Sequence, residues 1–370
     1  MSNPLIIDAV RTPLGKRKGQ FRDIQPIELA SFVLEKLVER SGIDPAMVED
    51  VIIGCVTQTG EQGANIARLS SLLAGFPPSV PAVSINRMCG SSQQAVHFAA
   101  QAILAGDMDL VIAGGVESMT RVPLGSDYAP FHPDLASRYG LVHQGISAEM
   151  IAEKWSVYRD ELDRYSLESH HKAFAATEEG FFEKEILPFK LGTDEGIRPD
   201  TTMEQLASLK PAFRKDGVVT AGNSSQLTDG AAALLISSES KAKELGLKGR
   251  AKILHRVVVG SDPVIMLDGI IPATRKILDI SGLSLSRMDW MEVNEAFASV
   301  VLAWQKELDP QMDRVNPWGG AIALGHPVGA SGARIMTTLV NGLEATGGTL
   351  GLQTMCIGHG MGTATIIERI

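Results

Sequence analysis

The segment at residues 83–118 constrains the fold of this chain more than any other. It is predicted to form a buried strand, a tight turn that carries Cys89, an amphipathic helix and a second strand that ends in two glycines. Apolar residues recur at helical spacing along the middle part, so one face of that helix is expected to pack inward. Ser91 and Ser92 stand where a helix N-cap is expected.

Cys89 is therefore expected at or just before a helix N-terminus. Free backbone N–H groups and the positive end of the helix dipole favour a thiolate there, which makes Cys89 a candidate nucleophile. The alternative is a cysteine that only fills the core of a packed turn, which is the commoner fate of a lone buried cysteine. This segment alone leaves both interpretations open.

Composition narrows the class of protein. The 370 residues include only three cysteines, without paired spacing, which argues against a disulfide framework and against a metal site of the zinc type. The net charge of −9 makes nucleic acid an improbable partner. The first residues lack the pattern of a signal peptide, and no apolar run approaches the roughly 18–20 residues of a membrane span. We therefore expect a cytoplasmic protein without integral membrane association.

The chain is predicted to have three parts. Strand and helix patterns alternate in residues 1–119, which predicts a largely parallel sheet with helices on both faces. Residues 120–229 are more polar and more charged, as expected of an inserted loop domain that lies over a scaffold and contacts substrate. The alternation resumes in residues 230–370 with the same order of strand, turn and helix. We interpret the first and third parts as duplicated halves that present their turns to one cleft.

Three polar residues of the third part are candidates for chemistry. His326 lies between a glycine and a proline ahead of a predicted helix, so its backbone is constrained, and its role could be catalytic or structural. Cys356 follows an apolar strand and precedes a glycine-rich turn that can aim N–H groups at an anion. A dinucleotide fingerprint does not fit GHGMG, because a strand and not a helix is predicted after it. Asn294, in NEAFA, could also be an N-cap.

Together these motifs resemble the thiolase family, and the resemblance covers essentially the whole chain. The matching segments, in chain order, are AVRTPLGKRKGQF, NRMCGSS, GGVESM, LKPAF, TAGNSSQLTDGAAA, NEAFA, GGAIALGHPVGASGAR and MCIGHGMG. CGSS followed by QA is most similar to bacterial degradative 3-ketoacyl-CoA thiolases, including the β-subunits of fatty-acid oxidation complexes. Biosynthetic acetoacetyl-CoA thiolases more usually carry a glycine at the position of Ser92. The resemblance implies a five-layered αβαβα fold made of two duplicated halves with an inserted loop domain.

The resemblance also implies an activity, the cleavage of 3-ketoacyl-CoA by CoA through an acyl-cysteine in fatty-acid β-oxidation. Cys89 would attack the 3-keto carbon, because a thiol can serve as both nucleophile and leaving group. His326 would accept the Cys89 proton and help to bind the thioester oxygen, and Cys356 would be the second acid and base. Asn294 would hold a water that forms one oxyanion hole with His326. The backbone N–H groups of Cys89 and Gly358 would form the other.

For CoA, which is a substrate, the resemblance points mainly to the inserted domain; it implies no tightly bound cofactor. A guanidinium such as that of Arg198 suits a phosphate or stacks on adenine, although an exposed arginine is often only solvated. The residues expected to contact CoA or the acyl group are Ser225, Ala221, Phe213, Arg198, His143, Leu135, Ala296 and Phe297.

Two residues depart from the family pattern. Trp318 stands where a small polar residue is common, and it could reshape the acyl pocket or pack beneath it. His359 occupies the variable position after Gly358, and we expect its side chain to face outward rather than into the cleft. Neither departure touches the catalytic positions, so an active enzyme is expected.

Other functions remain open to test. One alternative is an acetoacetyl-CoA thiolase of short-chain or biosynthetic metabolism. A decarboxylating ketoacyl synthase or a hydroxymethylglutaryl-CoA-type synthase has one cysteine, and the second cysteine in MCIGHG argues against both. A non-catalytic acyl-CoA-binding subunit would not need Cys89, His326 and Cys356 together. By resemblance we expect a homodimer or homotetramer, and a hydratase/dehydrogenase subunit of a β-oxidation complex is a further candidate partner. The acyl chain length is not fixed by the sequence.

Overall fold

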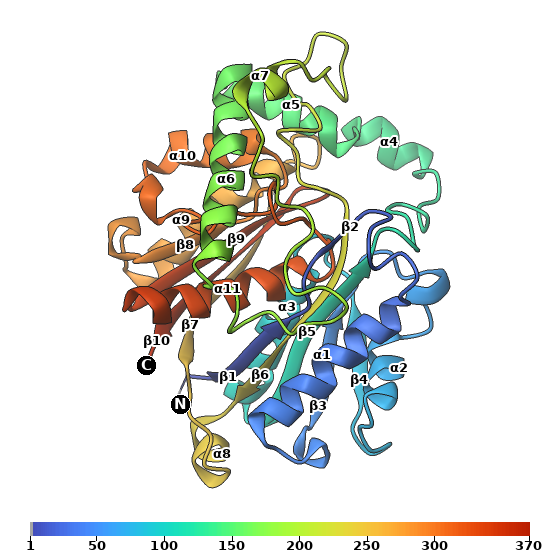
Figure 1. Cartoon of the computed structure of the whole chain (residues 1–370), viewed down its shortest axis with the longest axis vertical. Helices are drawn as coiled ribbons and strands as arrows, with labels where there is room; N and C mark the ends of the chain where they lie inside the picture. Colours follow the sequence, from blue (N-terminus) through green and yellow to red (C-terminus); the bar gives the residue numbers. More distant parts are fainter. Residues whose placement is uncertain (1–2) are drawn as a thin grey trace.

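The computed structural model describes residues 3–370, and its strands join into one ten-stranded mixed sheet in two halves (Figure 1). The order along the sheet is β4-β3-β5-β6-β1-β7-β10-β9-β8, with β2 beside β6. The strands are β1 Leu5–Arg11, β2 Gly15–Lys16, β3 Asp50–Gly54, β4 Ala82–Ile85, β5 Leu110–Ser118, β6 Thr228–Ser237, β7 Ala251–Gly260, β8 Trp290–Val293, β9 Leu350–Ile357 and β10 Met361–Arg369.

The helices fall into the two halves and the inserted segment between them. Those of the halves are α1 Pro26–Ser41, α2 Ile66–Leu73, α3 Ser91–Ala105, α8 Glu239–Glu244, α9 Ile270–Ser281, α10 Ala298–Leu308 and α11 Ser331–Thr346. Those of the insertion are α4 Pro133–Tyr139, α5 Gln144–Lys154, α6 Arg159–Glu178 and α7 Met203–Ala207. Short 3₁₀ turns lie at Pro45–Met47, Gly60–Gln62, Leu267–Gly269, Leu285–Arg287 and Met312–Arg314. None of the helices within residues 3–370 has both the length and the apolar character needed to cross a membrane.

Helices and sheet form five layers. Helices α1 and α2 cover one face of the first half-sheet, and α9 and α10 lie on the outer side of the second. Between the two half-sheets lie α3 and α11, which contact each other. The hydroxyl of Ser92 accepts a hydrogen bond from the backbone N–H of Ala333 at 2.9 Å and so ties the start of α3 to α11. The five-layered fold expected from the sequence is therefore the observed one.

Strand β6 illustrates how the sequence pattern sets these layers. All ten of its residues are buried, as expected of a strand covered on both faces. Alternate residues face opposite sides of a strand, so Leu235 packs with α1 and α2 whereas Leu234 and Ile236 pack with α3 and α11. The continuous apolar run thus reflects two separate hydrophobic cores.

The halves repeat one another locally. Helix α1 ends at Gly42 with a left-handed φ of 67°, followed by a 3₁₀ turn and β3. Helix α9 ends at Gly282 with the same φ, followed by a 3₁₀ turn and β8. Glycine adopts this conformation without strain, which makes it the usual end of a helix. The repeated order supports the interpretation of the two halves as a duplication.

The sheet differs from the expected one in strand direction and in the division of the chain. Strands β4, β3 and β5 are parallel, and so are β8 and β9, but the pairs that involve β6, β1, β7 and β10 are antiparallel. Strand β6 returns from the insertion without a crossover helix, which an antiparallel pair does not need. The boundary predicted between residues 229 and 230 places most of β6 in the C-terminal half. In the structure, β6 pairs with β1 and β5 of the N-terminal half.

Candidate active site

Four reactive side chains from both halves meet in one place. Cys89, at the start of α3, and His326, in the loop before α11, line one cavity of about 380 Å³. The amide Nδ2 of Asn294 lies 3.5 Å from the imidazole Nε2 of His326. The Asn294 side chain also hydrogen-bonds Cys356, whose thiol is close enough to Cys89 for their charges to interact. The structure thus brings together the catalytic residues predicted from separate motifs.

The turn that holds Cys89 is strained and closed by a serine. Met88 has a left-handed φ of 46°, which non-glycine residues seldom adopt. The N-cap of α3 is Gly90, so the expected N-cap position of Ser91 is wrong, and Ser91 is the first helical residue. Its hydroxyl accepts from the Arg87 N–H at 2.9 Å and donates to the Met88 carbonyl at 2.6 Å. The serine side chain is therefore used to close the turn rather than to cap the helix.

Burial dominates the titration of Cys89. It raises the pKa of this thiol to about 11, although backbone N–H groups of Gly358 and of Cys89 itself donate to the sulfur and favour the thiolate. Glu117 adds a smaller effect in the same direction as burial. The favourable effect of the helix N-terminus on a thiolate is present but outweighed by the loss of hydration. Cys89 rests as a thiol and needs a base.

His326, which lines the same cavity as Cys89, is the candidate base. Burial, and secondarily the charge of Arg334, lower its pKa to about 3, so the imidazole is neutral. The Ser331 hydroxyl donates to the carbonyl of Pro327 at 2.9 Å and lies 2.6 Å from Nδ1 of His326. Because a hydroxyl has one hydrogen to donate, this network assigns the imidazole proton to Nδ1. Nε2 is left unprotonated, and its lone pair faces the Asn294 amide Nδ2, a long hydrogen-bond donor at 3.5 Å.

Asn294 and Cys356 lie at the ends of neighbouring parallel strands. Asn294 follows β8, and its backbone N–H donates to the Thr354 carbonyl of β9 at 3.1 Å. It is not an N-cap, since α10 begins at Ala298. Its side-chain oxygen Oδ1 is buried without a hydrogen-bond partner among residues 3–370, which suits a group that holds a water or a substrate oxygen.

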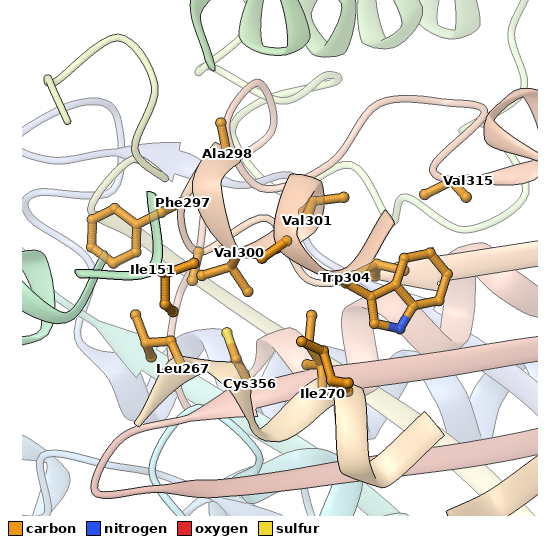
Figure 2. Packing of buried hydrophobic residues seen from close by; sticks show 14 of the residues in the cluster. Ile151, Leu267, Ile270, Phe297, Ala298, Val300, Val301, Trp304, Val315 and Cys356 are labelled. Carbon is orange, nitrogen blue, oxygen red and sulfur yellow. The ribbon is translucent and has the colours of Figure 1, made fainter. Parts of the chain in front are cut away.

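The thiol of Cys356 lies in an apolar environment. It points into the cluster that includes Leu267, Ile270 and Val300 (Figure 2). Burial is the largest cause of its raised pKa, and the neighbouring Cys89 is the next. Cys356 therefore also rests as a protonated thiol, which is the form that an acid must have.

Glu117 is a site residue that the sequence pattern did not predict. Its buried carboxylate accepts from the backbone N–H groups of Val56 at 2.8 Å, Thr57 at 3.1 Å and Gly329 at 3.0 Å, and from Nε2 of Gln62 at 2.7 Å. It thereby joins the end of β3 to the loop that carries His326. The motif GGVESM was the available signal, but a glutamate at a strand end can equally be a surface residue.

Five of the eight residues predicted to contact CoA or the acyl group line the first cavity: His143, Phe213, Ser225, Ala296 and Phe297. Leu135 lies further out, in a cavity of about 390 Å³. Ala221 and Arg198 instead line a separate cavity of about 160 Å³ that does not reach Cys89. The turn after Thr220 faces α7, and Gly222 in this turn packs on Leu206 and Leu209. This packing explains why Ala221 lies away from the cavity that contains Cys89.

The two departures from the family pattern are now placed. Trp318 is 6% exposed and packs on Phe181 and Trp290, each at 4.9 Å between ring centroids. It lines none of the cavities around Cys89, so it packs in the core. His359, which was expected to face outward, lines a second cavity of about 400 Å³ that includes Cys89 and Gly358. His359 is exposed, as expected, and at the same time forms part of the wall of this cavity; its backbone is left-handed, with φ of 64°.

The fold and this arrangement define an enzyme of cysteine-dependent acyl transfer, and comparison with known proteins identifies its family. Residues 5–240 match the sequence model of the thiolase N-terminal domain, and residues 247–369 match that of the thiolase C-terminal domain. The chain belongs to the thiolase family.

Similar proteins match over the full length. A steroid 3-ketoacyl-CoA thiolase, FadA6 of Mycobacterium tuberculosis, is 47% identical, and the match covers 100% of this chain and 95% of the relative's sequence. A 3-ketoacyl-CoA thiolase of Aliivibrio salmonicida is 48% identical over 100% of both chains. The crystal structure of the Bacillus anthracis acetyl-CoA acetyltransferase is 40% identical with a TM-score of 0.93, and covers 100% of this chain and 99% of that one.

Proposed function

We propose that this chain cleaves 3-ketoacyl-CoA with CoA to give acetyl-CoA and a shortened acyl-CoA, in fatty-acid β-oxidation. The observation that carries the proposal is the pair of buried thiols, Cys89 and Cys356, beside the unprotonated Nε2 of His326. Two successive proton-transfer partners are what a reversible carbon–carbon cleavage through an acyl-enzyme requires.

In the first half-reaction Cys89 loses its proton to Nε2 of His326, and its sulfur attacks the 3-keto carbon. The bond between C2 and C3 of the substrate then breaks, its electron pair forms the acetyl-CoA enolate, and Cys356 protonates that carbon. Because the pKa of Cys89 is about 11 and that of His326 about 3, a thiolate–imidazolium pair is disfavoured in the empty site. We infer that proton transfer accompanies attack.

In the second half-reaction the Cys356 thiolate takes the proton of incoming CoA, and the CoA sulfur attacks the acyl carbon on Cys89. The shortened acyl-CoA leaves, and His326 returns its proton to Cys89. The N–H groups of Cys89 and Gly358, which both donate to the Cys89 sulfur, are near enough to stabilise the acyl oxyanion. Asn294, through its unpartnered oxygen, would hold a water that acts with His326 on the other oxyanion.

The cavities support a degradative role. The first, with His143, Phe213 and Ser225, suits the pantetheine arm of CoA. The second contains Cys89 and is otherwise lined mainly by apolar residues such as Val56, Met266 and Val328, which gives room for an acyl tail longer than acetyl. The name of the Bacillus anthracis neighbour keeps acetoacetyl-CoA as the second candidate substrate, and that of the Mycobacterium tuberculosis relative keeps a ring-bearing acyl group.

The test is CoA-dependent cleavage of 3-ketoacyl-CoA substrates from acetoacetyl-CoA to long chains, with Cys89→Ala as control. Activity that extends to long chains and vanishes in C89A supports a degradative thiolase. Activity confined to acetoacetyl-CoA would move the assignment to an acetyl-CoA C-acetyltransferase. A wild-type protein that binds acyl-CoA but cleaves none of the substrates would favour the non-catalytic subunit.

We further propose a homodimer formed at the β4 edge of the sheet. Within residues 3–370, β4 pairs only with β3 and so has one open edge. Beside this edge, β4 and α2 expose large apolar side chains, a feature of protein interfaces: Val83 at 41%, Leu69 at 42%, Leu72 at 41% and Leu73 at 56%. Light scattering of wild type and Leu73→Glu tests this, with a tetramer or co-purification of a hydratase/dehydrogenase subunit as other outcomes.

We also propose a cytoplasmic location, because Cys89 and Cys356 must remain free thiols, as they are here.

A further inference from the structure

His359 joins two cavities on the acyl side of the site. The second cavity, of about 400 Å³, contains Cys89, and the third, of about 390 Å³, lies further from it. Phe131, Leu141 and His359 line both. A substrate tail that starts at Cys89 and outgrows the second cavity therefore passes His359.

The wall around this passage is aromatic and exposed. The side chains of Tyr128 and Phe131 are 53% and 47% exposed, and Leu135 and Tyr139, on α4, are 40% and 43% exposed. Exposed apolar surface that borders a cavity marks a ligand-binding region. The His359 ring lies edge-on to that of Phe131 at 6.0 Å and 6.4 Å from that of Tyr128. The imidazole thus lies in a mainly apolar and aromatic wall, at the place where the two cavities meet; the other polar lining residues include Gln144 in the second cavity and Ser261 in the third.

Two local features set His359 apart. Its φ of 64° lies in the left-handed region that favours glycine, so a histidine is held where glycine would be free of strain. Its imidazole also makes no hydrogen bond to any residue in the range 3–370, unlike the buried ring of His97, which pairs with Thr365 at 2.7 Å. The exposed imidazole is therefore open to solvent and to a ligand, and a polar group in a mainly apolar ligand cavity can fix the orientation of a ligand by hydrogen bonding.

We propose that His359 determines specificity by hydrogen bonding to an oxygen function on the acyl group where the second cavity passes into the third. The substrate class is a large, mainly apolar 3-ketoacyl-CoA with a hydroxyl or oxo group remote from the thioester. A plain hydrocarbon tail would remove water from the imidazole and offer no partner in return. The proposal rests on the thiolase function proposed above and names its substrate more closely.

The experiment compares matched pairs of 3-ketoacyl-CoA substrates that end in a methyl or a hydroxyl group, over a series of chain lengths. The quantity is the ratio of kcat/KM for the hydroxyl and methyl members. In the wild type this ratio should peak at the length that reaches His359. In His359→Phe, which keeps the aromatic wall, the peak ratio should fall about threefold to tenfold, the range expected for one neutral hydrogen bond.

Further variants separate recognition from structural damage. Asparagine tolerates a left-handed backbone and hydrogen-bonds, so His359→Asn should keep most of the peak. His171→Phe, which replaces an exposed histidine on α6 far along the chain from these cavities, should match the wild type. The loss in H359F should lie in KM, because a contact remote from the reacting atoms binds ground state and transition state alike.

Three results would overturn the proposal. One is a wild-type ratio without a peak while acetoacetyl-CoA is cleaved, which would leave the thiolase function intact and remove His359 from it. Another is an unchanged peak in H359F. The third is an equal fall in kcat for both members of a pair in H359F and H359N, which would assign His359 to the support of Gly358. Failure of the wild type to cleave even acetoacetyl-CoA would instead refute the function on which the proposal rests.

Discussion

Replacement of Glu117 by glutamine should destabilise the protein far more than its chemical similarity suggests. The carboxylate accepts four hydrogen bonds, two on each oxygen: Val56 and Gly329 on Oε2, Thr57 and Gln62 on Oε1. A glutamine keeps one oxygen and turns an NH₂ group toward the other two donors, whichever way its amide lies. Two buried N–H groups then lose their acceptor. At about 1–3 kcal/mol for each unsatisfied buried group, the free energy of unfolding should fall by about 2–6 kcal/mol.

Urea unfolding of E117Q measures this loss, and Glu61→Gln is the matched control. Glu61 pairs with Arg121 at 2.6 Å, but its side chain is 37% exposed, and such pairs contribute about 0–1 kcal/mol. We also expect kcat to fall in E117Q, since the bond to Gly329 positions the loop of His326. Equal shifts of the unfolding midpoint in E117Q and E61Q would refute the argument that the four donors depend on a carboxylate.

Other substitutions and conditions test separate parts of the structure. The rate of iodoacetamide labelling at Cys89, followed by mass spectrometry, should rise about tenfold per pH unit from neutral pH toward its pKa of about 11, and a plateau near pH 7 would contradict a buried thiol. Gly362→Ala should lower the free energy of unfolding by about 1–3 kcal/mol, because its Cβ would lie 2.1 Å from the Gly269 carbonyl oxygen. Gly260→Ala, which meets nothing within 4 Å, is its control, and equal melting temperatures would contradict the packing argument. Trp318→Ala should reduce that free energy by about 3–5 kcal/mol, yet leave the acyl chain-length profile unchanged; an altered profile would place this indole at the acyl pocket after all.

The sequence predicted those features that depend on local periodicity and on short motifs. The amphipathic helix expected within residues 83–118 is α3, and its apolar residues Val96, Ala99 and Ile103 are buried as the helical spacing predicts. The four candidate catalytic side chains come from separate motifs, and the structure places them together. Asn294 and Cys356 meet because they lie at the ends of the neighbouring strands β8 and β9, whereas Cys89 joins them through the packing of the two halves.

Features that depend on distant parts of the chain were not predictable in this way. The pairing of β6 with β1 and β5 is set by where the insertion returns, which no local pattern records. The raised pKa of Cys89 comes from atoms packed around it by the whole fold, against the local preference of the helix N-terminus. The His359 ring borders a cavity that Leu135 and Tyr139 of α4 also line, and the sequence pattern did not predict that helix.

The two central helices have a consequence for how the chain is made. Helix α3 buries its alanines against α11, and α11 begins more than two hundred residues later in the chain. During synthesis the inner face of the first half therefore stays uncovered until nearly the whole polypeptide has left the ribosome. Asn294, His326 and Cys356 are also synthesised late. Cys89 therefore lacks these neighbours until the last third of the chain has been translated. We expect nascent chains that end before α11 to be inactive, prone to aggregation and bound by chaperones.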